Sequence, residues 1–163
     1  MERRDFFRSF KKPFENKHKE TIILRPPYFK DKDSFYKECI DCDGLCATFC
    51  EENIIKIEKN KTPYIDFSNG GCTYCDECAK NCPKDVLKIE YKHNIEVNIQ
   101  IDMLKCLSWN STMCFSCKDP CLDNAIEFLG LFKPSINDNC TSCGFCISYC
   151  PTNAIILKER RKN

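Results

Sequence analysis

The sequence lacks several features by which common classes of protein are recognised. It has no glycine-rich loop of the kind that cradles phosphate groups, so neither nucleotide nor flavin binding is indicated. No apolar run approaches the roughly 20 residues that a transmembrane helix needs. Its basic residues do not interleave with aromatic ones in a patch suited to nucleic acid. We therefore expect no nucleotide pocket, no membrane span and no nucleic-acid partner.

Cysteine, by contrast, is abundant, with 16 residues in a chain of 163. All of them fall into four runs of four, which begin at residues 39, 72, 106 and 140. The second and fourth runs read C-x2-C-x2-C-x3-C-P. The first run has one more residue in its middle, and the third has seven residues between its first two thiols. The runs comprise Cys39, Cys42, Cys46 and Cys50; Cys72, Cys75, Cys78 and Cys82; Cys106, Cys114, Cys117 and Cys121; and Cys140, Cys143, Cys146 and Cys150.

This spacing is typical of cysteines that bind [4Fe–4S] clusters. Three closely spaced thiolates reach three iron atoms when the backbone wraps around the cluster, and in two-cluster ferredoxins the fourth ligates the other cluster. A disulfide framework would require an oxidising compartment. Structural zinc is usually held by two separated C-x2-C pairs. We predict four [4Fe–4S] clusters with all 16 cysteines as ligands, and no free redox-active thiol.

The segments that follow the runs predict a repeated fold. Each run leads into one helical turn and an apolar strand, and we expect three of these strands to have a hairpin partner before the next run. One such unit buries too little apolar surface to fold alone, so folding should depend on the metal. The predicted class is α+β: a ferredoxin-like polyferredoxin with four cluster-binding loop–helix–hairpin repeats and a basic N-terminal arm.

The charge distribution and the run positions predict three parts. Residues 1–37 hold 11 Lys/Arg and 6 Asp/Glu, a net charge of +5, and form a basic arm with a proline-rich strap. Residues 38–101 form a first two-cluster unit, and residues 102–163 form a second unit with a basic tail. Short connections favour pairing of adjacent runs, first with second and third with fourth. Nested pairing, first with fourth and second with third, is also physically possible.

The N-terminus begins like a twin-arginine export signal, with Arg3, Arg4 and Phe6 in the expected places. The apolar stretch that should follow is missing, since residues 9–20 are mostly charged and polar. We therefore interpret residues 1–20 as an arm, either a solvated tail or a docking segment, and expect a cytoplasmic protein. The two histidines, His18 and His93, lie in charged stretches, and we expect both at the surface.

Over nearly its full length the chain resembles the NapF family, the ferredoxin-type accessory proteins of periplasmic nitrate reductase systems. The resemblance rests on Arg3-Arg4-x-Phe6, on Arg25-Pro26-Pro27-Tyr28, and on the four cysteine runs with their stretched third member. The first run departs from the family pattern, because three residues, 43–45, separate its second and third cysteines. The resemblance implies a cytoplasmic iron–sulfur protein without catalytic residues, which contacts the precursor of the molybdenum-containing nitrate reductase subunit and takes part in its maturation.

Two functional hypotheses follow. In the first, the chain is a maturation and interaction protein, not an enzyme, whose clusters serve assembly of the nitrate reductase catalytic subunit. In the second, it is a soluble polyferredoxin that carries electrons to other redox proteins in a respiratory chain. A purely structural role for four oxygen-sensitive clusters is the least favoured interpretation.

Overall fold

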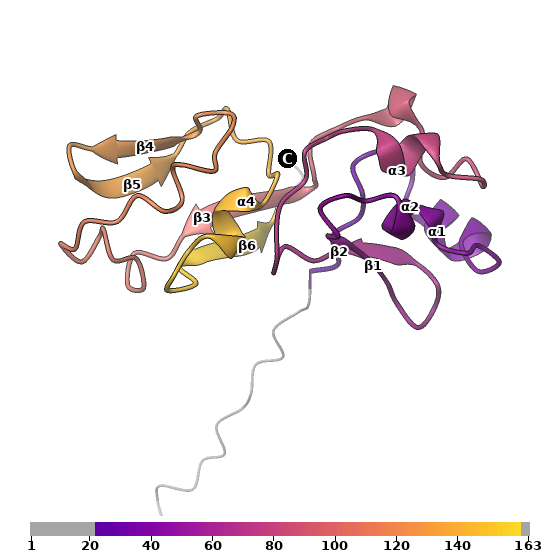
Figure 1. Cartoon of the computed structure of the whole chain (residues 1–163), viewed down its shortest axis with the longest axis horizontal. Helices are drawn as coiled ribbons and strands as arrows, with labels where there is room; N and C mark the ends of the chain where they lie inside the picture. The colour runs from indigo at the N-terminus through magenta and orange to yellow at the C-terminus, as the bar shows by residue number, and fades with distance from the viewer. Residues whose placement is uncertain (1–21, 161–163) are drawn as a thin grey trace, which may run out of the picture.

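The computed structural model describes residues 22–160. Figure 1 shows two lobes, one built from the first half of the chain and one around β4 and β5, with β3 and β6 between them. The helices are α1 (Asp33–Glu38), α2 (Leu45–Thr48), α3 (Glu77–Lys80), α4 (Phe145–Ser148) and the 3-10 helix η2 (Ile89–Tyr91). The strands are β1 (Ile55–Ile57), β2 (Pro63–Ile65), β3 (Val97–Ile101), β4 (Ile126–Leu129), β5 (Phe132–Ile136) and β6 (Ile155–Glu159).

The strands form antiparallel pairs. β1 pairs with β2, β4 pairs with β5, and β3 pairs with β6 in a register that matches Val97 with Glu159 and Ile101 with Ile155. The first two pairs are local hairpins. The third joins strands far apart in sequence, since β3 follows the second cysteine run and β6 follows the fourth. The central sheet therefore ties the two halves of the chain together.

The expectation of a hairpin after the second run was wrong. Leu87 forms an isolated antiparallel bridge with Phe29, which comes from the proline-rich strap, and η2 follows it. Ile95 and Val97 are fully buried, and β3 takes its partner from the end of the chain. The strap thus takes the place of the expected hairpin partner at Leu87, and the pairing of β3 with β6 is long-range.

Three of the cysteine runs contain a single helical turn built in the same way. α2, α3 and α4 each begin one residue before the third cysteine of a run, after a residue in the left-handed region: Gly44, Asp76 or Gly144, with φ of 72°, 68° and 88°. At Gly144 a side chain would also collide with the Phe67 ring. The extra residue of the first run, Asp43, precedes Gly44, so the chain from Gly44 onward follows the common geometry.

A second turn recurs after all four runs. The residue three positions beyond the last cysteine has a positive φ and donates its backbone N–H to the carbonyl of that cysteine. Asparagine and aspartate tolerate this left-handed conformation better than most residues. The four residues are Asn53, Asp85, Asn124 and Asn153.

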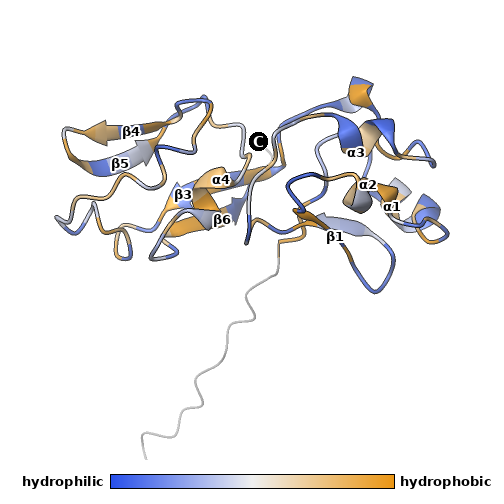
Figure 2. Cartoon of the chain, in the orientation of Figure 1, coloured by the Kyte–Doolittle hydropathy of each residue, from blue (hydrophilic) through white to orange (hydrophobic). Residues whose placement is uncertain are grey.

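The cores are small and lie against the cysteine runs. The larger core includes Leu24, Tyr28 and Phe35 from the strap and α1, whereas Ile126 and Ile155 belong to the smaller one. Figure 2 shows mostly hydrophobic residues on β4, mixed character on the other strands, and hydrophilic residues in the loop that follows β1. Within the described part of the chain, no helix has the length and apolar character needed to span a lipid bilayer.

Candidate metal centres

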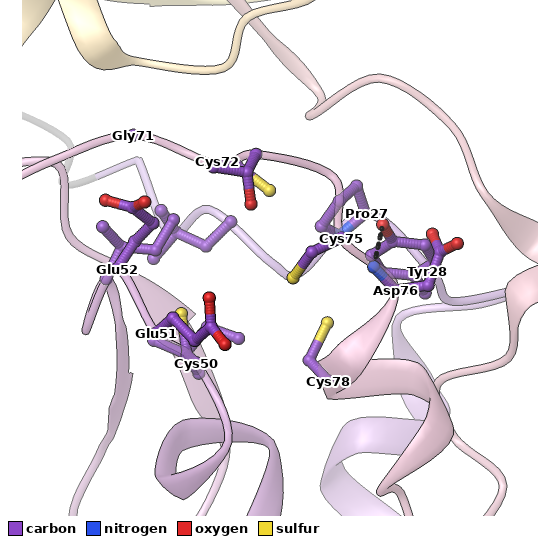
Figure 3. Close-up of a pocket in the computed structure, with 14 residues that line it drawn as sticks. Pro27, Tyr28, Cys50, Glu51, Glu52, Gly71, Cys72, Cys75, Asp76 and Cys78 are labelled. Atoms are coloured by element: carbon purple, nitrogen blue, oxygen red, sulfur yellow. Dashed lines mark hydrogen bonds between the residues drawn. The ribbon is translucent and has the colours of Figure 1, made fainter.

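One cavity collects thiols from two different runs. It is lined by Cys72, Cys75 and Cys78 of the second run and by Cys50, the last cysteine of the first. Figure 3 shows the sulfur atoms of these four residues facing a shared space beneath the loop that carries Cys72. Three ligands from one run and the fourth from another is the arrangement of two-cluster ferredoxins.

The same arrangement occurs in the other half of the chain. A second cavity is lined by Cys106, Cys114 and Cys117 of the third run, together with Cys150. A third is lined by the first three cysteines of the fourth run, together with Cys121. The stretched loop of the third run therefore still brings its thiols to one place.

The remaining four thiols form the reciprocal group of the first half. The charges of Cys42 and Cys82 both act on Cys39, and those of Cys82, Cys39 and Cys42 act on Cys46. Cys82 is the last cysteine of the second run, so the first and second runs exchange their final cysteines, as do the third and fourth. The structure has this sequential pairing and not the nested one.

The thiols are held where a negative charge is unfavourable. Burial, together with the neighbouring thiols Cys82, Cys39 and Cys42, raises the pKa of Cys46 to about 12. Burial likewise raises the pKa of Cys39, Cys72 and Cys117 to about 11 each, and the pKa of Cys78 and Cys146 by more. Because metal ligands must be thiolates, these groups need a positively charged metal centre among them.

Backbone donors point at the last cysteine of three runs. Ala154 N–H lies 3.2 Å from Cys150 Sγ, Ala125 N–H 3.3 Å from Cys121 Sγ, and Leu87 N–H 3.4 Å from Cys82 Sγ. Burial raises the pKa of Cys150, but the amides of Ala154 and Thr152 outweigh that effect and lower it. The recurring positive-φ turn presents these amides, and such donors stabilise a thiolate bound to a cluster.

The donor set fits an iron–sulfur cluster. In each cavity the thiols surround a space, and within residues 22–160 no group of three or more His, Cys, Asp or Glu side chains is placed to hold a single metal ion. A [4Fe–4S] cluster takes one thiolate on each of its four iron atoms, which suits four thiols spread around a cavity.

Two family models match parts of the chain. A 4Fe-4S dicluster domain matches residues 38–86, which contain the first two runs, and a 4Fe-4S binding domain matches residues 135–156, which contain the fourth. The ferredoxin-type protein NapF of Escherichia coli (strain K12) is 32% identical over 81% of this chain and 82% of its own length. The chain belongs to the NapF family. It is therefore an iron–sulfur protein of ferredoxin type, with 4Fe–4S clusters and a ferredoxin-like fold of short helices and strands.

A second NapF protein and one further relative are also similar to the chain. The NapF protein of Haemophilus influenzae is 31% identical over 91% of this chain and 87% of its own length. The pyruvate synthase subunit PorD of Methanothermobacter marburgensis is 40% identical, but over only 38% of this chain and 63% of its own length.

The third run, residues 106–121, lies outside both matched 4Fe-4S domains. Its loop is held by Asn110, whose side-chain amide donates to three carbonyls, among them that of Cys106.

Sequence reasoning missed a buried cation beside the first run. Arg25 is only 6% exposed and donates to Thr62 Oγ1 at 3.0 Å, to the Pro63 carbonyl and to Tyr36 Oη. Its charge acts on Cys39, where it opposes the effect of burial and lowers the thiol pKa. The signal available in the sequence was its place directly before the double proline of the strap.

The structure bears on only one of the two histidines, His93. His93 is half-buried and not fully exposed: its ring packs edge-on against Phe29 with the ring centres 4.7 Å apart, and its Nε2 is buried. Its chain segment is drawn inward because the His93 N–H donates to the Pro27 carbonyl of the strap. Residues 1–21, with the expected arm and His18, lie outside the described residues.

Proposed function

We propose that the chain binds four [4Fe–4S] clusters through its 16 cysteines. The observation that carries the proposal is the reciprocal grouping of thiols, three from one run and the last from its partner. Each bound cluster would exchange one electron at a potential set by hydrogen bonds, charge and exposure. The ligand sets are Cys39, Cys42, Cys46 and Cys82; Cys72, Cys75, Cys78 and Cys50; Cys106, Cys114, Cys117 and Cys150; and Cys140, Cys143, Cys146 and Cys121.

Iron analysis of the anaerobically reconstituted chain tests this number. We expect about 16 iron atoms per chain, four for each of four clusters. Cys50→Ser should lower the iron content by about four atoms per chain, because it removes one ligand from one cavity. Thr48→Ala, at an exposed position of α2 between Cys46 and Cys50 whose side chain is not a ligand, is the matched control and should keep full loading. Equal iron in all three proteins would contradict the ligand assignment.

The proposed role is maturation of a partner, and not enzymatic catalysis. Membership of the NapF family over most of the chain supports a cytoplasmic protein that contacts the precursor of the periplasmic nitrate reductase catalytic subunit before export. Its clusters would serve loading or reduction of that subunit's cofactor. The basic residues of the N-terminal arm could dock the precursor: Arg3, Arg4 and Arg8 replaced by Ala should weaken its capture, and unchanged capture would count against arm docking.

The second candidate is a polyferredoxin that carries electrons to other redox proteins. The observation in its favour is that four thiol groups lie within one small molecule. Rapid, reversible oxidation by a physiological partner at catalytic rates would support this role, and slow stoichiometric transfer would contradict it.

One experiment separates the two roles. Nitrate reductase activity is assayed in cells that lack this chain, with an artificial reduced dye as electron donor. The dye bypasses the natural electron supply. Loss of dye-driven activity means that the catalytic subunit was never assembled properly, which supports maturation. Normal dye-driven activity with poor growth on nitrate means that the chain carries electrons.

A further inference from the structure

The two halves of the molecule meet at a closely packed contact between the second and fourth runs. Cys72 donates its backbone N–H to the Cys143 carbonyl at 2.7 Å. The contact leaves no room for a side chain at Gly71, since a Cβ there would lie 2.5 Å from the backbone nitrogen of Phe145. A backbone approach this close fixes the second run against the fourth.

Side chains around this contact reinforce it. Tyr74 donates its hydroxyl to the Thr141 carbonyl at 2.5 Å, and the same hydroxyl accepts from Ile95 N–H at 3.2 Å. Ser142, which is 3% exposed, donates to the Val97 carbonyl at 2.7 Å. We call this contact between the second and fourth runs the junction. Side chains of both runs, Tyr74 and Ser142, hold it with hydrogen bonds beside β3 and β6.

The contact joins two particular thiol groups. Cys72 lines the cavity that also holds Cys50, Cys75 and Cys78, and Cys143 belongs to the group that lines the cavity with Cys121. The thiol of Cys143 is close enough for its charge to act on that of Cys72. These two cavities are thus neighbours across the junction.

Within each half, the two thiol groups are neighbours as well. Cys46 and Cys78 are buried in the same apolar core and come from α2 and α3, which pack against each other. Cys117 and Cys146 are buried together in the other core. Each half therefore contributes one group at the junction and one group away from it.

We propose that the four sites form a single series in the order first, second, fourth and third run, joined in the middle by the Cys72–Cys143 contact. This proposal rests on the proposed binding of four clusters and adds their order, which differs from the order in sequence. The sites of the first and third runs are the two ends, so a partner that docks at one end of the molecule meets one of these first. Tyr74 acts as a positioning residue for the inner pair.

Two matched variants of the full-length chain test the order. The inner-pair chain carries Cys39→Ser, Cys42→Ser, Cys106→Ser and Cys114→Ser, which disable the outer sites and keep every ligand of the inner ones. The outer-pair chain carries the reverse set, Cys72→Ser, Cys75→Ser, Cys140→Ser and Cys143→Ser. Both are reconstituted and fully reduced, and their electron paramagnetic resonance spectra are recorded.

We expect the inner-pair spectrum to be split or broadened by magnetic interaction between the two clusters. The outer-pair spectrum should be the sum of two isolated signals, because two sites separate its clusters. An interaction that is as strong in the outer pair would overturn the order, as would its absence from a loaded inner pair. Iron content separates the two levels of the proposal: a native chain that takes up no iron refutes cluster binding, whereas loaded chains with the wrong interaction refute only the order.

Hydrogen exchange provides a second measurement that does not depend on these multiple variants. In the native reconstituted protein we expect the Cys72 amide to exchange slowly. Gly70→Ala should leave that protection intact, because its Cβ would have the flexible Glu52 side chain at 3.3 Å as its nearest contact and would meet the Glu52 carbonyl and Ile54 only at ordinary van der Waals distances. Gly71→Ala should abolish it, because its Cβ would meet the Phe145 backbone. A Cys72 amide that exchanges freely in the native protein would refute the junction.

Discussion

At the scale of single residues, Arg25 combines deep burial with a full positive charge. Within residues 22–160 no carboxylate lies at ion-pair distance from it, and its ring contacts are with Phe35 and Tyr36 at 5.2 and 5.4 Å. A buried cation without a carboxylate is unfavourable unless negative charge lies nearby. Once a cluster is bound, the thiolates of the first run would supply that charge, and Cys39 is the thiol on which Arg25 acts.

Removal of this charge should shift the potential of one cluster. Reduction adds negative charge, so Arg25→Gln should make reduction of the first-run cluster less favourable and lower its potential by about 40 mV, the one-electron equivalent of about 1 kcal/mol. The potentials of the other clusters should stay nearly constant. A redox titration followed by electron paramagnetic resonance measures each of them.

Arg25→Lys is the matched control, since it keeps the charge but loses the planar guanidinium that bonds Thr62 and Tyr36. Arg25→Lys should lower thermal stability, but it should leave the potential of the first-run cluster nearly unchanged. If Lys and Gln lowered the potential equally, packing and not charge would be the cause.

At the scale of elements, the positive-φ turn is the feature that recurs most regularly. It follows each of the four runs and directs an amide toward the last cysteine in three of them. An L-residue with a branched side chain is strained in this conformation by roughly 1–2 kcal/mol. The turn is therefore a local feature that shapes the environment of the last cysteine through residues close to it in sequence.

Asn153, with φ of 51°, is the test position for this turn. Asn153→Val should reduce the thermal stability of the loaded protein by an amount equivalent to about 1–2 kcal/mol, because valine resists the left-handed region. Asn153→Gly should change it little, since glycine adopts this conformation freely. Melting of both variants, followed by circular dichroism, measures the difference. Similar losses in both would show that the asparagine side chain, and not the backbone conformation, matters.

At the scale of the whole molecule, two small cores and three two-stranded sheets surround the thiol groups. Two-stranded sheets with only three to five residues in each strand are marginal without packing against a core. Buried thiols occupy part of both cores. Without metal, nothing would link these thiols to one another across the cavities. Metal binding and folding should thus be coupled.

Removal of the clusters should therefore unfold the chain. Treatment with an oxidant and an iron chelator should abolish the circular dichroism spectrum of the loaded protein. It should also abolish the protection of the β3 and β6 amides against hydrogen exchange. Anaerobic addition of iron, sulfide and reductant should restore both, whereas zinc should not restore the visible absorption of the loaded protein. A stripped chain that kept its β3–β6 protection would contradict metal-dependent folding.

Local spacing within the sequence determined the chemistry of this protein. The interval of two or three residues between thiols acts over one turn of backbone, so membership of a ferredoxin family and the ferredoxin-like class of fold followed from the runs. Short connections also favoured the sequential exchange of Cys50 and Cys82. These features depend on neighbours in the chain, and neighbours are what a sequence displays.

Tertiary structure decided what depends on contacts between distant residues. Three such contacts join segments that lie 37 to 71 residues apart in the sequence. They are the pairing of β3 with β6, the approach of Cys72 to Cys143 and the burial of Arg25 against Thr62. Gly71 and Gly144 look like ordinary loop residues until the chain that fills the space beside them, at Phe145 and Phe67, is known. Whether two apolar strands meet depends on which other edges are already occupied, and that is a property of the folded chain as a whole.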